Sequence, residues 1–185
     1  MRSLQVYHSN EELPATYECQ IRAYVRMLWH DHYLYDLDEP FIPPERHPHY
    51  VVMVERHALF SAARVNWVTV EHAGEGLRMY CLGDVFTYPA FRKQGYGRQV
   101  VAAATDLIRS DPEADAAILF TQPDLNNFFG QSGWKHIAGL SASVGERDNA
   151  EPHHYFAMML FLSDRARAMQ TAFETQPIFL PGYAW

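Results

Sequence analysis

Residues 88–99 read Tyr-Pro-Ala-Phe-Arg-Lys-Gln-Gly-Tyr-Gly-Arg-Gln, and this stretch decides how the rest of the chain is interpreted. The segment before it, Leu77–Tyr88, is apolar on both of its alternating faces, which predicts a central β-strand covered on each side. Pro89 ends that strand, because proline has no N–H for a ladder. The segment Gly95–Arg109 then carries an apolar stripe at helical spacing. A short cationic turn with two glycines therefore joins a buried strand to a helix.

This turn has the properties of a phosphate site. The first N–H groups of a helix are unpaired and carry partial positive charge, and Gly95 and Gly97 let an anion approach them closely. Arg92, Lys93 and Arg98 add formal charge. The alternative is a tight turn that uses glycine only for its positive φ. A Walker loop is excluded because no Gly-Lys-Ser/Thr follows, and a dinucleotide fingerprint because no glycine directly follows the strand.

Length and charge limit the class of protein. The chain has 185 residues, 48% hydrophobic and 20% charged, with a net charge of −7. This length suits a single domain spanning residues 1–185. The acidic balance argues against a nucleic-acid partner, and the longest apolar run, Tyr155–Leu162, is far too short to cross a membrane. We therefore expect a cytoplasmic protein with neither a membrane nor a nucleic acid as partner.

Cysteine and histidine give no sign of a disulfide or a metal site. Cys19 and Cys81 each lie in an apolar pattern, so we expect two reduced core thiols. His30 and His32 are two residues apart and do not share a helical face. No metal cofactor is expected.

The remaining pattern predicts an α+β fold. A helix is expected over residues 14–30, a proline-rich loop over 36–49, and a short helix over 123–131, before Gly133. A weak helix is expected over 164–173. The expected strands lie at 3–7, 50–55, 59–70, 77–88, 116–121, 134–137 and 154–162.

These residues resemble a known family. Arg92-x-x-Gly95-x-Gly97, after a strand ending in Thr87-x-Pro89 and before an amphipathic helix, resembles the acetyl-CoA motif of the GNAT superfamily of N-acetyltransferases. The resemblance runs from about residue 50 to 162 and includes Gly133-Trp134, similar to the Gly-Phe pair of that family. It implies a mixed, mostly antiparallel central sheet of six to seven strands, flanked by helices on both faces.

The resemblance also implies a co-substrate, acetyl-CoA, and its contacts. The backbone of Val85, Phe86 and Thr87 would pair with the pantetheine arm as an extra strand, and the strand at 116–121 would splay away to open a cleft. Gly83 supports this separation of the strands, because glycine inside a strand often marks a β-bulge or a close approach of the backbone. The pyrophosphate would be held by the stretch Arg92, Lys93, Gln94, Gly95, Tyr96, Gly97 and Arg98.

The implied reaction transfers an acetyl group to a primary amine of a small molecule, a protein N-terminus or a lysine, by direct attack in a ternary complex. The attacking amine must lose its proton to a carboxylate or a bound water. Asp84 stands alone in an apolar stretch and is a candidate base, although a structural aspartate held by neighbouring amides has the same pattern. By analogy, a backbone N–H near Phe86 or Thr87 would stabilise the oxyanion.

The acid step departs from the family. The usual tyrosine, four residues before the glycine of the Gly-Phe pair, corresponds here to Phe129. The thiolate then leaves unassisted, or another hydroxyl such as Tyr88 protonates it, or the protein is a non-catalytic acyl-CoA binding or sensing domain. Besides an acetyltransferase and an acyl-CoA binding domain, the third class of function that the sequence allows is a nucleotide-binding protein of another kind.

The acceptor is not revealed. The resemblance places the region Tyr33–Tyr50, with Tyr33, Tyr35, Asp36, Asp38, Glu39 and Glu45, along the acceptor site. A terminal Trp185 with Gly133-Trp134 is similar to aminoglycoside 2'-N-acetyltransferases, but Tyr183 and Gly83 replace acidic residues of those enzymes. The tail segment Ile178–Leu180 reads otherwise as an apolar strap on the core or on a second subunit, and a homodimer is possible.

Overall fold

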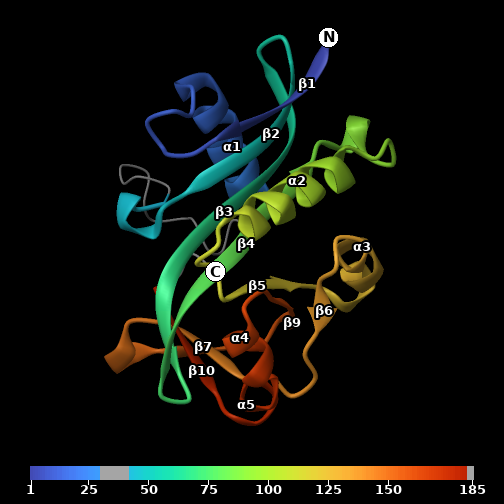
Figure 1. Cartoon of the computed structure of the whole chain (residues 1–185). Coiled ribbons are helices and arrows are strands. Elements are labelled where there is room, and N and C mark those ends of the chain that lie inside the picture. The colour runs from blue at the N-terminus through green and yellow to red at the C-terminus, as the bar shows by residue number, and fades with distance from the viewer. Residues whose placement is uncertain (30–41, 183–185) are drawn as a thin grey trace. The chain divides into compact units, whose positions relative to one another are not determined.

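The computed structural model describes residues 1–29 and 42–182 (Figure 1). The helices are α1 (Ala15–Leu28), α2 (Tyr96–Ser110), α3 (Asn126–Gly130), α4 (Asp164–Ala168) and α5 (Gln170–Thr175). The strands are β1 (Arg2–Tyr7), β2 (His49–Glu55), β3 (Ala58–His72), β4 (Glu75–Thr87), β5 (Ala116–Thr121), β6 (Lys135–His136), β7 (Ala142–Gly145), β8 (Glu151–His153), β9 (Phe156–Phe161) and β10 (Ile178–Pro181).

The strands form a seven-stranded sheet in the order β1-β2-β3-β4-β5-β9-β6 and a three-stranded sheet in the order β10-β7-β8. In the larger sheet β4 and β5 are parallel, whereas β1–β2, β2–β3, β5–β9 and β6–β9 are antiparallel. The predicted α+β class, the mixed and mostly antiparallel sheet and the central place of β4 are confirmed. The smaller sheet was not predicted.

The chain divides into two compact units. Unit 1 comprises Met1–Asn66 and Asp84–Ala104, and unit 2 comprises Trp67–Gly83 and Thr105–Trp185. Strands β3 and β4 and helix α2 are thus each shared between the units. Whether the chain acts as a single domain stays a prediction.

Unit 1 has its core between α1 and the strands β2 to β4. The predicted apolar face of α1 is buried, and it packs on alternate residues of β2, including Val52 and Val54. The intervening Val51 and Met53 are also buried, so β2 is covered on both faces. Cys19 is exposed, which makes the prediction of a core thiol wrong there, because it lies on the outer face of α1. Cys81 is buried as predicted.

The core of unit 2 gathers apolar residues of β4, β5, β7, β9, β10 and α5. The tail segment contributes to it, because Ile178 and Leu180 are buried and β10 runs parallel to β7. The apolar strap therefore packs on the core of its own chain.

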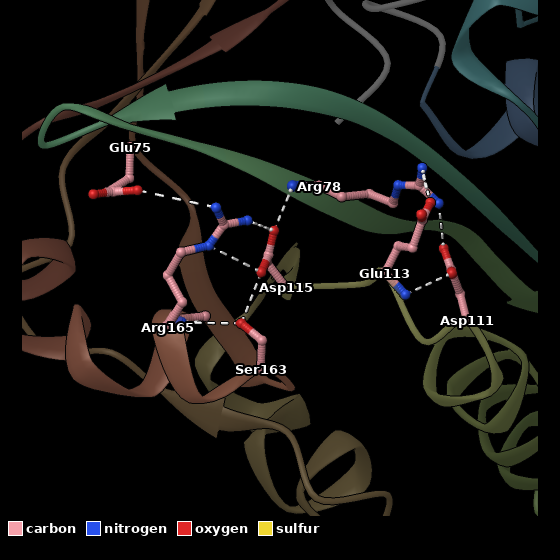
Figure 2. A network of polar contacts seen from close by, with 8 residues as sticks. Glu75, Arg78, Asp111, Glu113, Asp115, Ser163 and Arg165 are labelled. Atoms are coloured by element: carbon pink, nitrogen blue, oxygen red, sulfur yellow. Dashed lines mark hydrogen bonds and ion pairs between the residues drawn. The ribbon is translucent and has the colours of Figure 1, made fainter.

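A polar network around Asp115 ties the segments of unit 2 together (Figure 2). One carboxylate oxygen of Asp115 accepts the Arg78 N–H (2.9 Å) and the Arg165 guanidinium (2.5 Å), and the other accepts the Ser163 hydroxyl (2.7 Å). The side chain is only 8% exposed. Burial alone would raise the pKa of Asp115, but the hydrogen bonds from Arg165, Ser163 and Arg78 outweigh it, and the net pKa is lowered. The network therefore favours the ionised carboxylate.

His72, in unit 2, is a buried histidine whose environment favours its neutral form. The His72 ring is 3% exposed, stacks on Phe173 with centroids 4.4 Å apart, and has an unpaired Nε2. Burial lowers its pKa, so the folded state prefers the neutral ring. Below about pH 6.5 the unfolded chain takes up the proton more readily, and stability falls as the pH drops.

We expect His72→Phe to flatten this loss of stability on the acid side. One titrating group contributes at most about 1.4 kcal/mol per pH unit. Thermal unfolding at several values between pH 5 and 7.5 measures the slope, and His57→Phe, on an exposed turn, is the matched control. An identical slope in wild type and His72→Phe would contradict the assignment.

Candidate acetyl-CoA site

The loop between β4 and α2 contains two residues with left-handed backbones, a feature of anion-binding turns. A short 3-10 turn, Pro89–Phe91, follows the strand. Lys93 then has φ 60° and Gly95 has φ 84°, both left-handed. A left-handed residue that is not glycine is uncommon. Successive amides in such a turn point into one concavity that suits an anion.

The backbone N–H groups of this loop are free to bind. Within residues 1–29 and 42–182, none of the amides from Lys93 to Arg98 donates to another group, whereas the Arg92 amide closes the preceding turn onto Pro89. Unpaired amides at the start of a 15-residue helix carry its partial positive charge. The loop therefore presents a row of free donors to solvent, as the sequence predicts.

The side chains of the loop divide into two groups. Arg92 Nε donates to the carbonyl of Thr87 (2.9 Å) and Gln94 Nε2 to that of Ala90 (3.2 Å), so both brace the loop from within. Lys93 and Arg98 are exposed and form no ion pair with any described residue. These two cations are therefore available to an anionic ligand.

The strand segment Val85–Thr87 is fixed on its β3 side, and among the described residues no strand pairs with its other edge. The Ser61 hydroxyl donates to the carbonyl of Phe86 (2.9 Å) and is 2.8 Å from Oγ1 of Thr87, and the Tyr88 N–H bonds to Phe60 (2.9 Å). The ladder of β4 with β5 covers only Met79–Cys81. The segment has no partner in β5, which suits pairing with an extended ligand.

Asp84 bends the strand just before this segment. Its φ is 50°, so the bend falls at Asp84 and not at Gly83, since aspartate tolerates the left-handed region better than most residues. Arg64 Nε donates to Asp84 Oδ2 at 2.5 Å, and their side chains are 2% and 7% exposed respectively. Arg64 also donates to the Asn66 side chain. Asp84 is thus held in a buried ion pair.

Two tyrosines lie beside Phe86 in unit 1. The ring of Tyr24, on α1, lies 4.4 Å from that of Phe86 and 4.3 Å from that of Tyr88. Burial, followed by the nearby Tyr24, raises the pKa of Tyr88, which keeps its proton in place. Among the described residues neither hydroxyl donates a hydrogen bond. The sequence places Tyr24 on the apolar face of the helix, where it is indeed buried, but did not predict that it lies beside Phe86 and Tyr88.

Phe129 lies in unit 2 and provides no proton donor. It is 5% exposed in α3, edge-on to Phe128 at 4.9 Å. The following Gly133-Trp134 pair is ordered by its own contacts. Gly133 has φ 92° and faces the Arg109 guanidinium, while Trp134 Nε1 donates to Thr105 (3.0 Å).

Several candidate residues lie outside the described part of the chain, namely His30, His32, Tyr33, Tyr35, Asp36, Asp38, Glu39, Tyr183 and Trp185. Glu45 is described and exposed. Among the described residues no group of three potential ligands is placed to hold a metal ion. No helix in residues 1–29 and 42–182 has both the length and the apolar character needed to cross a membrane.

Comparison with solved structures identifies the fold. The structure is similar to that of ElaA from Escherichia coli, with a TM-score of 0.61 and 17% identity over 86% of this chain and 99% of that one. It is also similar to the E. coli GNAT family N-acetyltransferase YhbS in complex with CoA, with a TM-score of 0.59 and 17% identity over 96% and 88% of the two chains.

A third similar structure is the aminoglycoside acetyltransferase AAC(6')-Ib with coenzyme A and kanamycin (TM-score 0.53, 15% identity, 90% of this chain and 98% of that one). None of the curated proteins compared with the chain matches it. In sequence, the family model described as Acetyltransferase (GNAT) family matches residues 13–132, more than half of the chain. The chain therefore belongs to the GNAT family of acetyltransferases.

Proposed function

We propose that the chain transfers the acetyl group of acetyl-CoA to a primary amine by direct attack in a ternary complex. The observation that carries this proposal is the row of free amides from Lys93 to Arg98 at the start of α2. A pyrophosphate fits such donors, and the open strand edge at Val85–Thr87 lies in the same unit. The acceptor is an amine of a small molecule, a protein N-terminus or a lysine.

Each part of the cofactor would have its own partners. The amides of residues 93–98 would bind the pyrophosphate, with Lys93 and Arg98 supplying charge. The open edge of Val85–Thr87 would hydrogen-bond the pantetheine arm as a neighbouring strand does. Arg92 would act from within the loop, through its bond to Thr87. In this arrangement the protein supplies position and charge, and acetyl-CoA supplies the activated acyl group.

The proton transfers need a base for the amine and an acid for the leaving thiolate. The neutral amine attacks the thioester carbon, the C–S bond breaks, and the thiolate takes up a proton. Since Arg64 already occupies Asp84 Oδ2, the ion pair favours a bound water over Asp84 as the base. Tyr88 is the candidate acid, because its hydroxyl is protonated and donates to no described group. Without it, the thiolate would leave unassisted.

The test is a calorimetric titration with acetyl-CoA, CoA and ADP, followed by an amine screen read by free thiol. We expect micromolar binding of acetyl-CoA, about −8 kcal/mol, and release of thiol that depends on the added amine. ADP should bind more weakly, because it lacks the pantetheine arm that the strand edge would pair. Equal affinity for ADP and CoA would instead favour a nucleotide-binding protein of another kind.

A non-catalytic acyl-CoA binding or sensing domain is the second candidate. The observation in its favour is the buried Phe129 in place of the usual tyrosine. Such a protein would bind acetyl-CoA normally but release no thiol with any amine. Aminoglycosides belong in the screen as one class of acceptor, and light scattering would test the possible homodimer.

Asp84→Asn separates the two possible roles of that carboxylate. Without its charge, the buried Arg64 loses its counter-ion, and we expect the free energy of unfolding to fall by about 3 kcal/mol. If a water is the base, kcat falls by less than about tenfold with an unchanged pH profile. A loss above about 100-fold, with the basic limb of the profile removed, would make Asp84 the base. Asp106→Asn, on the exposed surface of α2, is the control.

A further inference from the structure

Arg2, in strand β1, lies against the residues that flank the loop 92–95 in the same unit. Its guanidinium carbon is 5.3 Å from the ring centroids of Phe91 and Tyr96 and 5.6 Å from that of Phe60. Arg2 Nη1 donates to the hydroxyl of Tyr96, and Nε donates to Glu55 Oε2 at 3.2 Å. One side chain thus contacts three aromatic rings and joins two hydrogen-bond acceptors.

Two of the three rings lie at the two ends of the loop, and the third, Phe60, belongs to β3. Phe91 immediately precedes Arg92, and Tyr96 immediately follows Gly95. Both pack on Phe60, which is 1% exposed, Phe91 stacked at 4.6 Å and Tyr96 edge-on at 4.9 Å. The two ends of residues 92–95 therefore rest on one buried ring and under one guanidinium.

We propose that Arg2 is a positioning residue. By contacting Phe91 and Tyr96 together, it would fix both ends of the loop of residues 92–95 and hold the free amides of residues 93–98 in the binding conformation. The planar guanidinium suits this task, because it stacks on aromatic faces while its fork of donors reaches separate acceptors. This inference rests on the proposed function, since it assigns a purpose to the order of the same loop.

The loop needs such support from outside. Its residues are exposed, Lys93 and Gly95 have left-handed backbones, and its amides from 93 to 98 are unpaired. The braces that it supplies itself are the bonds from Arg92 to Thr87 and from Gln94 to Ala90. A binding loop that is ordered before its ligand arrives does not lose that entropy on binding. Removing the contacts of Arg2 should therefore weaken cofactor binding without altering the chemical step.

We expect Arg2→Ala to raise the Kd of acetyl-CoA about tenfold, with an increase in KM and an unchanged kcat. In the protein without ligand, hydrogen exchange of peptides covering residues 91–99 should become faster, while the rest of unit 1 is unaffected. Arg2→Lys keeps the charge but loses the planar fork, and it should recover less than half of the lost affinity. Glu55→Gln, which leaves the ring contacts in place, should bind within about twofold of wild type.

Several results would overturn the role proposed for Arg2. Recovery of full affinity by Arg2→Lys would show that Arg2 acts through its charge alone. Unchanged exchange in residues 91–99 of Arg2→Ala would show that the loop is ordered without it. If the wild-type protein does not bind acetyl-CoA, the proposed function fails, and the exchange measurement still decides whether Arg2 orders the loop.

Discussion

Gly95→Val should abolish binding of acetyl-CoA, with at least a 100-fold rise in Kd. Gly95 has φ 84°, and a side chain there is strained by about 1–2 kcal/mol even though the space around it is open. We expect the loop to relieve this strain by changing its backbone conformation, which would move its amides away from the ligand. Each amide bond to a charged phosphate contributes about 1.5–3 kcal/mol, so the loss of two accounts for the expected effect. A calorimetric titration of the wild type and the variant, under conditions in which both are folded, measures the rise in Kd.

The chain offers a matched control for this substitution. Gly74, in the turn between β3 and β4, has φ 85° and likewise nothing within 4 Å of an added Cβ. Gly74→Val should therefore cost similar stability and leave the Kd unchanged. If Gly95→Val binds acetyl-CoA as tightly as Gly74→Val does, residues 92–98 form only a turn, and the enzymatic proposal falls with the loop.

Asp115→Ala should lower the free energy of unfolding by about 2–4 kcal/mol. The carboxylate is buried and accepts hydrogen bonds from Arg78, Ser163 and Arg165, which belong to β4, the segment after β9, and α4. Removing it leaves a backbone N–H and a hydroxyl without partners, and each such group costs about 1–3 kcal/mol. Chemical denaturation measures the difference in the free energy of unfolding.

Glu113 provides the comparison, because it belongs to the same network and pairs with Arg78 at 2.5 Å, but its side chain is 69% exposed. Glu113→Ala should change stability by less than about 1 kcal/mol, as exposed pairs do. Equal losses for the two substitutions would contradict the view that burial and multiple hydrogen bonds give Asp115 its importance.

The elements with a strong period were predictable from sequence. Helix α1 with its apolar face, strand β4 with two apolar faces, and α2 behind the glycine pair all lie within a few residues of their predicted bounds. The smaller sheet was not predictable, because β7 and β8 have four and three residues, too few to show a period. The pairing of β7 with β10 also depends on contacts distant in sequence.

The candidate site was predictable in part. Local spacing was enough for the loop at Arg92–Arg98, since glycine, charge and helix start are adjacent in sequence. The environment of Asp84 was not, because its partner Arg64 comes from another strand. The positions of Tyr24 and Arg2 beside the site were not predicted for a similar reason. Neither position has a local signal, and each residue gains its place only when its element packs beside β4 or α2.

The pairing of β1 also has a consequence for how the molecule assembles. Strands β2 and β3 are joined by a tight turn at Arg56-His57, whereas Arg2 pairs with Glu55 across 53 residues of chain. Closing so long a loop is entropically expensive, so β1 should dock after the hairpin has formed. The binding conformation of the loop would then be completed late in folding, and a chain whose first strand has not docked would bind acetyl-CoA more weakly than the folded protein.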